Sequence, residues 1–290
     1  KRVRPGRDDK ILTSWSALMI SALVSGFRAT KENIYLEQAK QAATFLLAKM
    51  EQDGNLARTY GRGKARLTGY LDDYAYLVQA LLDLCACDSE TKWFDKAQLL
   101  GEKSIEYFYS SEEKDFYYTP KNHESLILRP KNYFDGAVPS GTSVTCMNLL
   151  RLYRLSDNEK FQKIALDTIG TYASLFERAP DQFANMLCAL DMHLSVGKEI
   201  VLILDSDDSE SQRFLQSALC RFAPNDIELV KTKDSLHSSP LFEGRELKQG
   251  KSTAYICQNH ACKEPITDID LLEAELHCHL VKSSQKETKN

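Results

Sequence analysis

The 290-residue chain lacks several features that would place it in a specialised class of protein. It has no stretch of about 18 apolar residues, so no membrane-spanning helix is expected. Its net charge is only −4, and its basic residues are scattered outside the first seven positions, which argues against a nucleic-acid-binding protein. The hydrophobic fraction of 43% and the charged fraction of 27% are instead those of an ordinary globular protein.

Cysteine is sparse, with eight residues in 290, far below the density of a small disulfide-stabilised domain. Four of the cysteines have apolar neighbours, where a reduced cysteine packs as a small hydrophobe: Cys85, Cys146, Cys188 and Cys220. This usage favours a reducing compartment, and we expect a cytoplasmic location. The chain opens with Lys1-Arg2-Val3-Arg4-Pro5, without an initiator Met or an apolar signal region. We therefore expect a piece of a longer protein, with any targeting signal outside it.

Apolar residues recur at spacings of three and four along the first two thirds of the chain, which predicts amphipathic helices. The expected helices cover residues 9–28, 35–50, 70–85, 94–108, 146–153, 161–176 and 180–195. Most of them form pairs that repeat every 60 to 70 residues or so, the pattern of repeated helical hairpins. Two long connections, residues 55–69 and 111–139, contain strand-like pieces such as Phe116–Thr119 and Leu126–Leu128. Loops of this length are commonly functional or carry their own structure.

The pattern changes after Gly197. Strands are predicted at residues 199–205, 226–230 and 252–257, and helices at 209–222 and 268–280. We therefore expect a helical domain over residues 1–197 and a small α/β unit over 198–280. The charged tail over 281–290 is expected to be disordered.

The first helix of each pair opens with a polar cluster, whereas the second does not. The clusters are Arg7-Asp8-Asp9-Lys10, Tyr70-Leu71-Asp72-Asp73-Tyr74 and Asp135-Gly136-Ala137-Val138-Pro139-Ser140-Gly141. If the first helices line an inner ring, their N-termini meet at one end of it. Free N–H groups and partial positive charge would make this end a polar rim that can bind a ligand.

Carboxylates beside aromatic rings suit a sugar, because acids bind or protonate sugar oxygens while rings stack on the apolar sugar face. The candidate catalytic residues are Asp9, Asp73 and Asp135, and the candidate ligand-binding residues are Arg7, Trp15, Tyr70, Asp72, Tyr74 and Ser140. Glycoside hydrolysis by two carboxylates would need them about 5 to 10 Å apart. Helix capping is the alternative role for each of these acids, since Asp is a common N-cap residue.

The histidines and cysteines give weaker evidence for a functional site. None of the six histidines lies in a polar opening, so no histidine acid/base pair is visible. Four residues separate Cys257 from Cys262, whereas a redox CxxC pair is separated by two. Structural, metal-binding and dithiol roles are open for these two cysteines, with His277, Cys278 and His279 downstream. We expect no metal and no other cofactor.

Taken together, several motifs resemble those of the thioredoxin-domain-containing family that includes the spermatogenesis-associated protein. They are Arg4-Pro5 with Asp8–Trp15, Gly69–Ala75, Asp135–Gly141, Asn148–Leu152, and Cys257 and Cys262 followed by Pro265. The resemblance extends from residue 1 to about residue 280. It implies a thioredoxin-like domain upstream, followed by an (α/α)6 barrel similar to those of six-hairpin glycosidases and N-acylglucosamine 2-epimerases.

On this resemblance the chain is the C-terminal part of such a protein: mainly α, with paired-helix hairpins forming part of an (α/α)6 barrel, followed by the α/β unit. The expected ligand is a carbohydrate-like small molecule in the barrel pocket. The alternative is a non-catalytic scaffold or client-binding module that serves the upstream thioredoxin-like domain, with the role in fertility suggested for animal members. Whether the chain is an enzyme stays open.

The sequence departs from the family pattern at two places. Ser16-Ala17 stands where the family usually has Asn-Gly, and Thr142 stands where it usually has Asn. Both changes remove an amide side chain that could donate and accept hydrogen bonds at the rim.

Overall fold

The computed structural model describes residues 2–123, 127–206, 208–219, 221–258 and 261–284. The predictions for Leu126, Cys220, His260 and the tail beyond Ser284 lie outside the described residues, as do the side chains of His277, Cys278 and His279.

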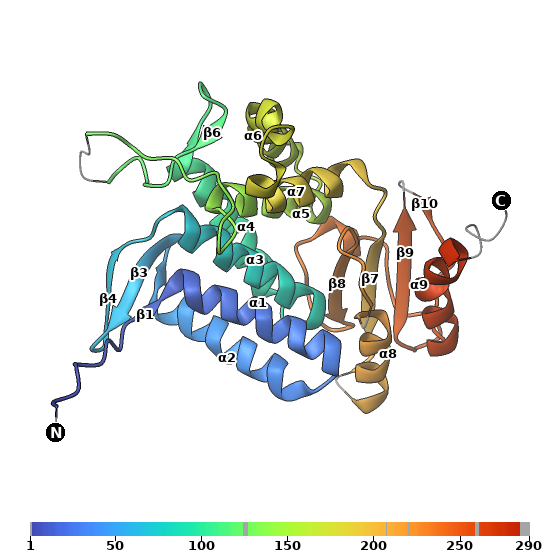
Figure 1. Cartoon of the computed structure of the whole chain (residues 1–290). Helices are drawn as coiled ribbons and strands as arrows, with labels where there is room; N and C mark the ends of the chain where they lie inside the picture. Colours follow the sequence, from blue (N-terminus) through green and yellow to red (C-terminus); the bar gives the residue numbers. More distant parts are fainter. Residues whose placement is uncertain (1, 124–126, 207, 220, 259–260, 285–290) are drawn as a thin grey trace.

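Seven α-helices occupy residues 13–194 of the described chain; the first six pack as three antiparallel pairs, and the seventh packs against the fifth (Figure 1). They are α1 (Thr13–Thr30), α2 (Asn33–Lys49), α3 (Leu71–Cys87), α4 (Lys92–Phe108), α5 (Gly141–Ser156), α6 (Glu159–Phe176) and α7 (Ala184–Leu194). Each odd-numbered helix also packs against the next, α1 on α3, α3 on α5 and α5 on α7. The predicted mainly α architecture of helical hairpins is confirmed. None of the described helices is long and apolar enough to cross a membrane.

Contacts between helices separate an inner row from an outer one, and burial differs most clearly between α3 and α2. Helix α3 buries residues on nearly all of its faces, as a helix surrounded by protein does. Helix α2 buries only one stripe, Leu36, Ala39, Ala43 and Leu46, as a helix with one face in solvent does. Because α1, α3, α5 and α7 pack against one another in that order, they form the inner row, and α2, α4 and α6 lie outside it.

Short strands fill the connections before the inner helices. The first group is β1 (Ile11–Leu12), β2 (Glu51–Gln52), β3 (Asn55–Gly61) and β4 (Lys64–Thr68), and a second pair is β5 (Tyr109–Ser110) with β6 (Asp115–Phe116). Because Ile11 pairs with Tyr60 and Leu12 with Thr59, the first helix begins at Thr13 rather than near residue 9. The predicted strand at Phe116–Thr119 is reduced to its first residue.

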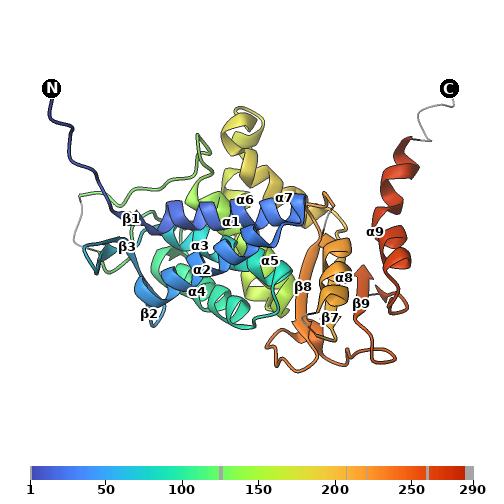
Figure 2. The ribbon, with the colours of Figure 1, turned by 90° about the horizontal axis from the view of Figure 1, so that it is seen from below.

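The C-terminal α/β unit contains β7 (Glu199–Leu204), α8 (Ser209–Leu219), β8 (Ile227–Thr232), β9 (Thr253–Gln258), β10 (Ala261–Cys262) and α9 (Ile269–Ser284). Its sheet has the order β10-β9-β7-β8, in which only the β7–β8 pair is parallel. Two 3₁₀ turns, Pro180–Phe183 and Pro240–Phe242, precede α7 and β9. Figure 2 shows α9 on the side of the sheet away from the helical hairpins.

A group of buried and partly buried charges joins the α/β unit to the hairpins, and we call it the seam: Arg28, Arg221, Asp226 and Glu228. Strand β8 packs against α3 and α5. Glu228 on β8 accepts from Arg28 of α1 and from Arg221, each at 3.0 Å, and Arg221 also pairs with Asp226. Every charge in the seam has a partner of opposite sign, which is the condition under which charges are tolerated in an interior.

Candidate functional site

The fully buried carboxylate of Asp73 joins the N-termini of α1 and α3. Its Oδ1 accepts from the amide of Ser14 at 3.0 Å, and its Oδ2 accepts from the amide of Tyr70 at 2.9 Å. Arg58 of β3 adds an ion pair at 3.2 Å. A single carboxylate thus satisfies free N–H groups of two helices, a stabilising arrangement at helix N-termini.

The carboxylate of Asp135 joins the N-termini of α5 and α7 in the same way. Its Oδ1 accepts from the amide of Ser140 at 2.8 Å and the hydroxyl of Ser143 at 2.6 Å, both at the start of α5. Its Oδ2 accepts from the amide of Asn185 at 2.8 Å and that of Met186 at 3.3 Å, at the start of α7. Ser140 is the N-cap of α5, with its hydroxyl accepting from the amide of Ser143.

Asp72 lies where α3 meets α5. A Cβ on Gly141, the first residue of α5, would come within 2.4 Å of Asp72 Oδ1 and 3.2 Å of its backbone nitrogen. Glycine is therefore required for the two helix ends to approach this closely. Through Asp73, Asp72 and Asp135, the N-termini of α1, α3, α5 and α7 meet at one place, which we call the rim.

The environment of Asp72 shifts its titration. Burial, and then the neighbouring charge of Asp73, raises the pKa of Asp72 to about 6, against smaller opposing effects of the Tyr118 hydroxyl, Arg58 and the Gly141 amide. Burial also raises the pKa of Asp73, opposed by the amide of Tyr70 and by Arg58. A carboxyl group with a pKa of about 6 can act as a proton donor or acceptor near neutral pH.

Aromatic and basic side chains surround Asp72 and Asp73. The Tyr70 ring lies 5.1 Å from that of Tyr118 and 5.7 Å from that of His123, measured between ring centroids. The Arg58 guanidinium lies 4.5 Å from the centre of the Tyr70 ring, a cation–π contact. The sequence analysis missed Arg58, Tyr118 and His123. Their only signal was their position in the two long connections, which have no periodicity that would indicate where a side chain points.

Buried polar atoms without a partner gather at this rim. The described part of the chain contains eight buried side-chain nitrogen or oxygen atoms that make no hydrogen bond. Four of them lie on the segments that meet here: Asp72 Oδ1, Thr119 Oγ1, His123 Nδ1 and Thr142 Oγ1. Because such atoms are costly in an interior, stability alone does not explain why half of them lie on the segments of the rim.

The other predicted site residues lie outside the rim or are buried in the core. Arg7 and Asp9 form an exposed ion pair, 2.8 Å long, on the extended segment before β1. Only Ile11 and Leu12 of this segment pair with β3, and the Asp9 carboxylate before them is 73% exposed, unlike the buried acids of the rim. Trp15 is 70% exposed in the first turn of α1. Tyr74 is only 1% exposed, and its hydroxyl accepts from Leu56 and donates to Gly54, so the prediction that it stacks on a ligand is corrected to a core role.

Cys257 and Cys262 are bonded to each other in a disulfide, across the β9–β10 pair. Among the described residues, no group of three or more His, Cys, Asp or Glu side chains could hold a metal ion.

The paired helices and their inner row form part of an (α/α)6 barrel, the fold of the six-hairpin glycosidases. A GH76 α-mannanase of Bacteroides thetaiotaomicron matches it with a TM-score of 0.54 and 10% identity, over 98% of this chain and 72% of that one. At this identity the match concerns the fold alone.

In sequence, the chain is similar to spermatogenesis-associated protein 20, which confirms the resemblance drawn from the motifs. The human protein is 27% identical over 95% of this chain and 37% of its own length. The rat protein is 29% identical over 93% of this chain and 36% of its own length. The chain thus spans little more than a third of these relatives. No family model matches it.

Proposed function

We propose that the rim binds and processes a carbohydrate-like ligand, with Asp72 as the group that donates or accepts a proton. The observation that carries this proposal is that Asp72, whose pKa is raised to about 6, has a buried oxygen without a hydrogen-bond partner, and that three further such atoms lie on the segments of the rim. A sugar carries several hydroxyl groups, which can donate to and accept from polar atoms of this kind. Tyr70 and Tyr118 add ring faces of the kind that stack on sugars.

The structure suggests different roles for the two neighbouring acids. Asp73 has its oxygens occupied by two backbone amides and Arg58, so we assign it to holding the rim together. Asp72 has an oxygen without a partner, so we assign the chemistry to it. Asp135, bound to four donors, would position α5 and α7. A protein that shares this fold is an α-mannanase, so we choose mannose-containing carbohydrates as the first ligands to test.

The test compares Asp72→Asn with Asp181→Asn, an exposed carboxylate before α7, in the protein at its full natural length. Binding of α-manno-oligosaccharides and other glycans is measured by calorimetry and on a glycan array, followed by hydrolysis and epimerisation assays. We expect Asp72→Asn to abolish turnover and Asp181→Asn to leave it intact. If Asp72 acts as an acid, wild-type activity falls as the pH rises through about 6. Absence of binding by the wild type, or unchanged turnover in Asp72→Asn, would refute the proposal.

A second candidate is a non-catalytic scaffold or client-binding module that serves an upstream thioredoxin-like domain. The observation in its favour is that Asp73 and Asp135 are fully engaged as helix caps, as the capping interpretation expects. This candidate predicts partner proteins that co-purify equally with wild type and with Asp72→Asn. The same pair of variants therefore separates the two functions.

A further inference from the structure

We propose that the Cys257–Cys262 disulfide is a thiol–disulfide exchange site that accepts electrons from a dithiol, with Arg245 stabilising the Cys257 thiolate released by reduction. This site is separate from the rim and does not depend on the proposed carbohydrate function. Four features support it: the inequality of the two sulfurs, the contact with Arg245, the unpaired charge of that side chain, and an adjacent cavity.

The two cysteines differ in access. Cys257 on β9 is 2% exposed, whereas Cys262 on β10 belongs to the exposed residues. Since an attacking thiolate must reach a disulfide sulfur directly, the sulfur of Cys262 is the one open to attack. Cys257 then becomes the leaving group. The other described cysteines offer no second pair: Cys85, Cys87 and Cys146 are buried free thiols whose pKa is raised by burial, and Cys188 is an exposed free thiol.

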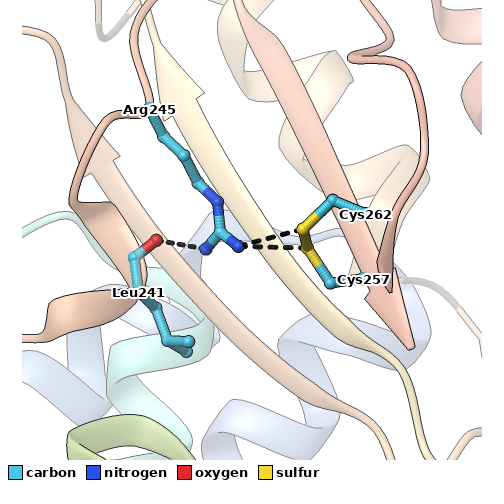
Figure 3. The surroundings of a disulfide bond; sticks show 4 residues. All are labelled: Leu241, Arg245, Cys257 and Cys262. Atoms are coloured by element: carbon cyan, nitrogen blue, oxygen red, sulfur yellow. Dashed lines mark hydrogen bonds between the residues drawn. A yellow bond between two sulfur atoms is a disulfide. The ribbon is translucent and has the colours of Figure 1, made fainter. Parts of the chain in front are cut away.

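Arg245 contacts both sulfurs (Figure 3). Its Nη2 donates to the Sγ of Cys257 at 3.0 Å and to that of Cys262 at 3.4 Å, while its Nη1 donates to the carbonyl oxygen of Leu241. A neutral disulfide sulfur is a weak acceptor, so a guanidinium gains little from it. A thiolate at the same place would accept a charge-assisted hydrogen bond, which is roughly twice as strong as a neutral one.

The charge of Arg245 is not neutralised by an ion pair within the described part of the chain. Glu199 favours its charged form from a distance, but the Glu199 carboxylate pairs with Arg154 at 3.6 Å. Burial lowers the pKa of Arg245, in keeping with a cation that has lost water without gaining a carboxylate. The contrast with the seam is clear, because Arg221 there has two acidic partners. A cation without an acidic partner, next to a cysteine sulfur, favours the thiolate form of that cysteine.

A cavity of about 550 Å³ borders the disulfide. Its wall includes Cys257, Cys262 and Arg245 on one side and Tyr153, Arg154 and His193 from the helical hairpins on another. The cavity gives a thiol-bearing segment a route to the sulfurs, where a disulfide packed inside a core would have none.

The exchange transfers two electrons from the dithiol to the Cys257–Cys262 disulfide. One thiolate of the dithiol attacks the Sγ of Cys262, forming a mixed disulfide, and the bonding electron pair leaves on the Sγ of Cys257 beside Arg245. The second thiol of the reductant, now deprotonated, then attacks the reductant's other sulfur, which is bonded to Cys262 in the mixed disulfide. Cys262 leaves as a thiolate and takes up a proton. The dithiol is oxidised to a disulfide, and Cys257 and Cys262 gain two electrons in all.

The experiment equilibrates the protein with buffers of reduced and oxidised dithiothreitol at pH 7. The reduced fraction of the Cys257–Cys262 pair is read by alkylation and peptide mass spectrometry, which resolves it from the other cysteines. Wild type is compared with Arg245→Gln, Arg245→Lys and the control Arg213→Gln, an exposed arginine on α8. We expect Arg245→Gln to lower the equilibrium constant for reduction about tenfold, Arg245→Lys to restore part of it, and Arg213→Gln to match wild type. Circular dichroism shows whether each variant is folded.

The direction of attack is tested in Cys257→Ser and Cys262→Ser, each treated with oxidised glutathione. We expect Cys262 in the first variant to form the mixed disulfide at least tenfold faster than Cys257 in the second, because of its exposure. A disulfide that dithiothreitol cannot reduce in the folded protein, or an Arg245→Gln variant with the wild-type equilibrium, would overturn the proposal. If Arg245→Gln fails to fold, the result with Arg245→Lys and the two serine variants decides.

Discussion

The seam and the rim both hold charged side chains in the interior, yet the two regions treat them differently. In the seam, Glu228 is 7% exposed and has two arginine partners, and Arg221 has two acidic ones. At the rim, Asp73 is similarly satisfied, but Asp72 beside it keeps an unpartnered oxygen and a raised pKa. Since buried charges are normally paired, full pairing in the seam calls for no role beyond a structural one. Incomplete pairing in an otherwise well-packed fold marks a region with another task.

This comparison predicts the largest loss of stability in the seam. Glu228→Ala removes the shared partner of Arg28 and Arg221 and leaves two cations facing each other. We expect the free energy of unfolding to fall by about 4 kcal/mol, measured by urea denaturation. Glu243→Ala, an exposed glutamate before β9, is the control and should leave the midpoint unchanged. A small effect in both would show that the seam is not a stabilising contact.

A smaller loss is expected at the structural acid of the rim. Asp73→Ala removes acceptors from the amides of Ser14 and Tyr70 at the starts of α1 and α3. Each lost cap costs about 1 kcal/mol, so we expect a loss of about 2 kcal/mol in the same assay. An unchanged unfolding midpoint would mean that other donors and acceptors replace this carboxylate.

Replacing Asp72, in contrast to the two previous residues, should increase the stability of the protein. Its pKa in the folded protein, about 6, is above the ordinary value, so protonation stabilises the fold and this stability is lost as the pH rises through about 6. Asp72→Asn removes this dependence. Discounting for partial exposure, we expect the variant to gain about 1 kcal/mol on wild type between pH 4 and pH 7. A variant that loses stability relative to wild type over this range would contradict the assignment.

The smallest effect is expected at Asp9, which the sequence grouped with the rim acids. Its carboxylate is 73% exposed and pairs only with the exposed Arg7. Asp9→Asn should therefore leave both the unfolding midpoint and any ligand binding at the rim as in wild type. Loss of ligand binding in this variant would show that Asp9 does belong to the ligand-binding site.

The helices and strands followed from sequence because their signals are local. Spacings of three and four placed all seven hairpin helices, and the change of pattern after Gly197 marked the strand at Glu199–Leu204. The boundary of α1 was wrong because Ile11 and Leu12 pair with a strand more than 40 residues away, which no local pattern reveals. Tyr74 was misjudged for a related reason: its partners, Leu56 and Gly54, lie in another element.

The site was only partly predictable. The repeated Asp-rich openings indicated Asp72, Asp73 and Asp135, since each lies at the start of an inner helix. The division of labour between Asp72 and Asp73 could not be read from two adjacent identical residues, because it depends on which carboxylate faces Ser14 and Arg58 and which faces Gly141. Arg245 likewise meets Cys257 and Cys262 only through the fold of the sheet.

The central claim is that Asp72 is held as a titratable acid while Asp73 serves the structure. The most direct measurement is a carbon-13 NMR titration of the Asp72 side-chain carboxyl, assigned by its loss in Asp72→Asn. We predict a midpoint of about 6 that moves toward lower pH in Asp73→Asn, where the neighbouring negative charge is gone. A midpoint near 4, the value of an ordinary exposed aspartate, would contradict the account.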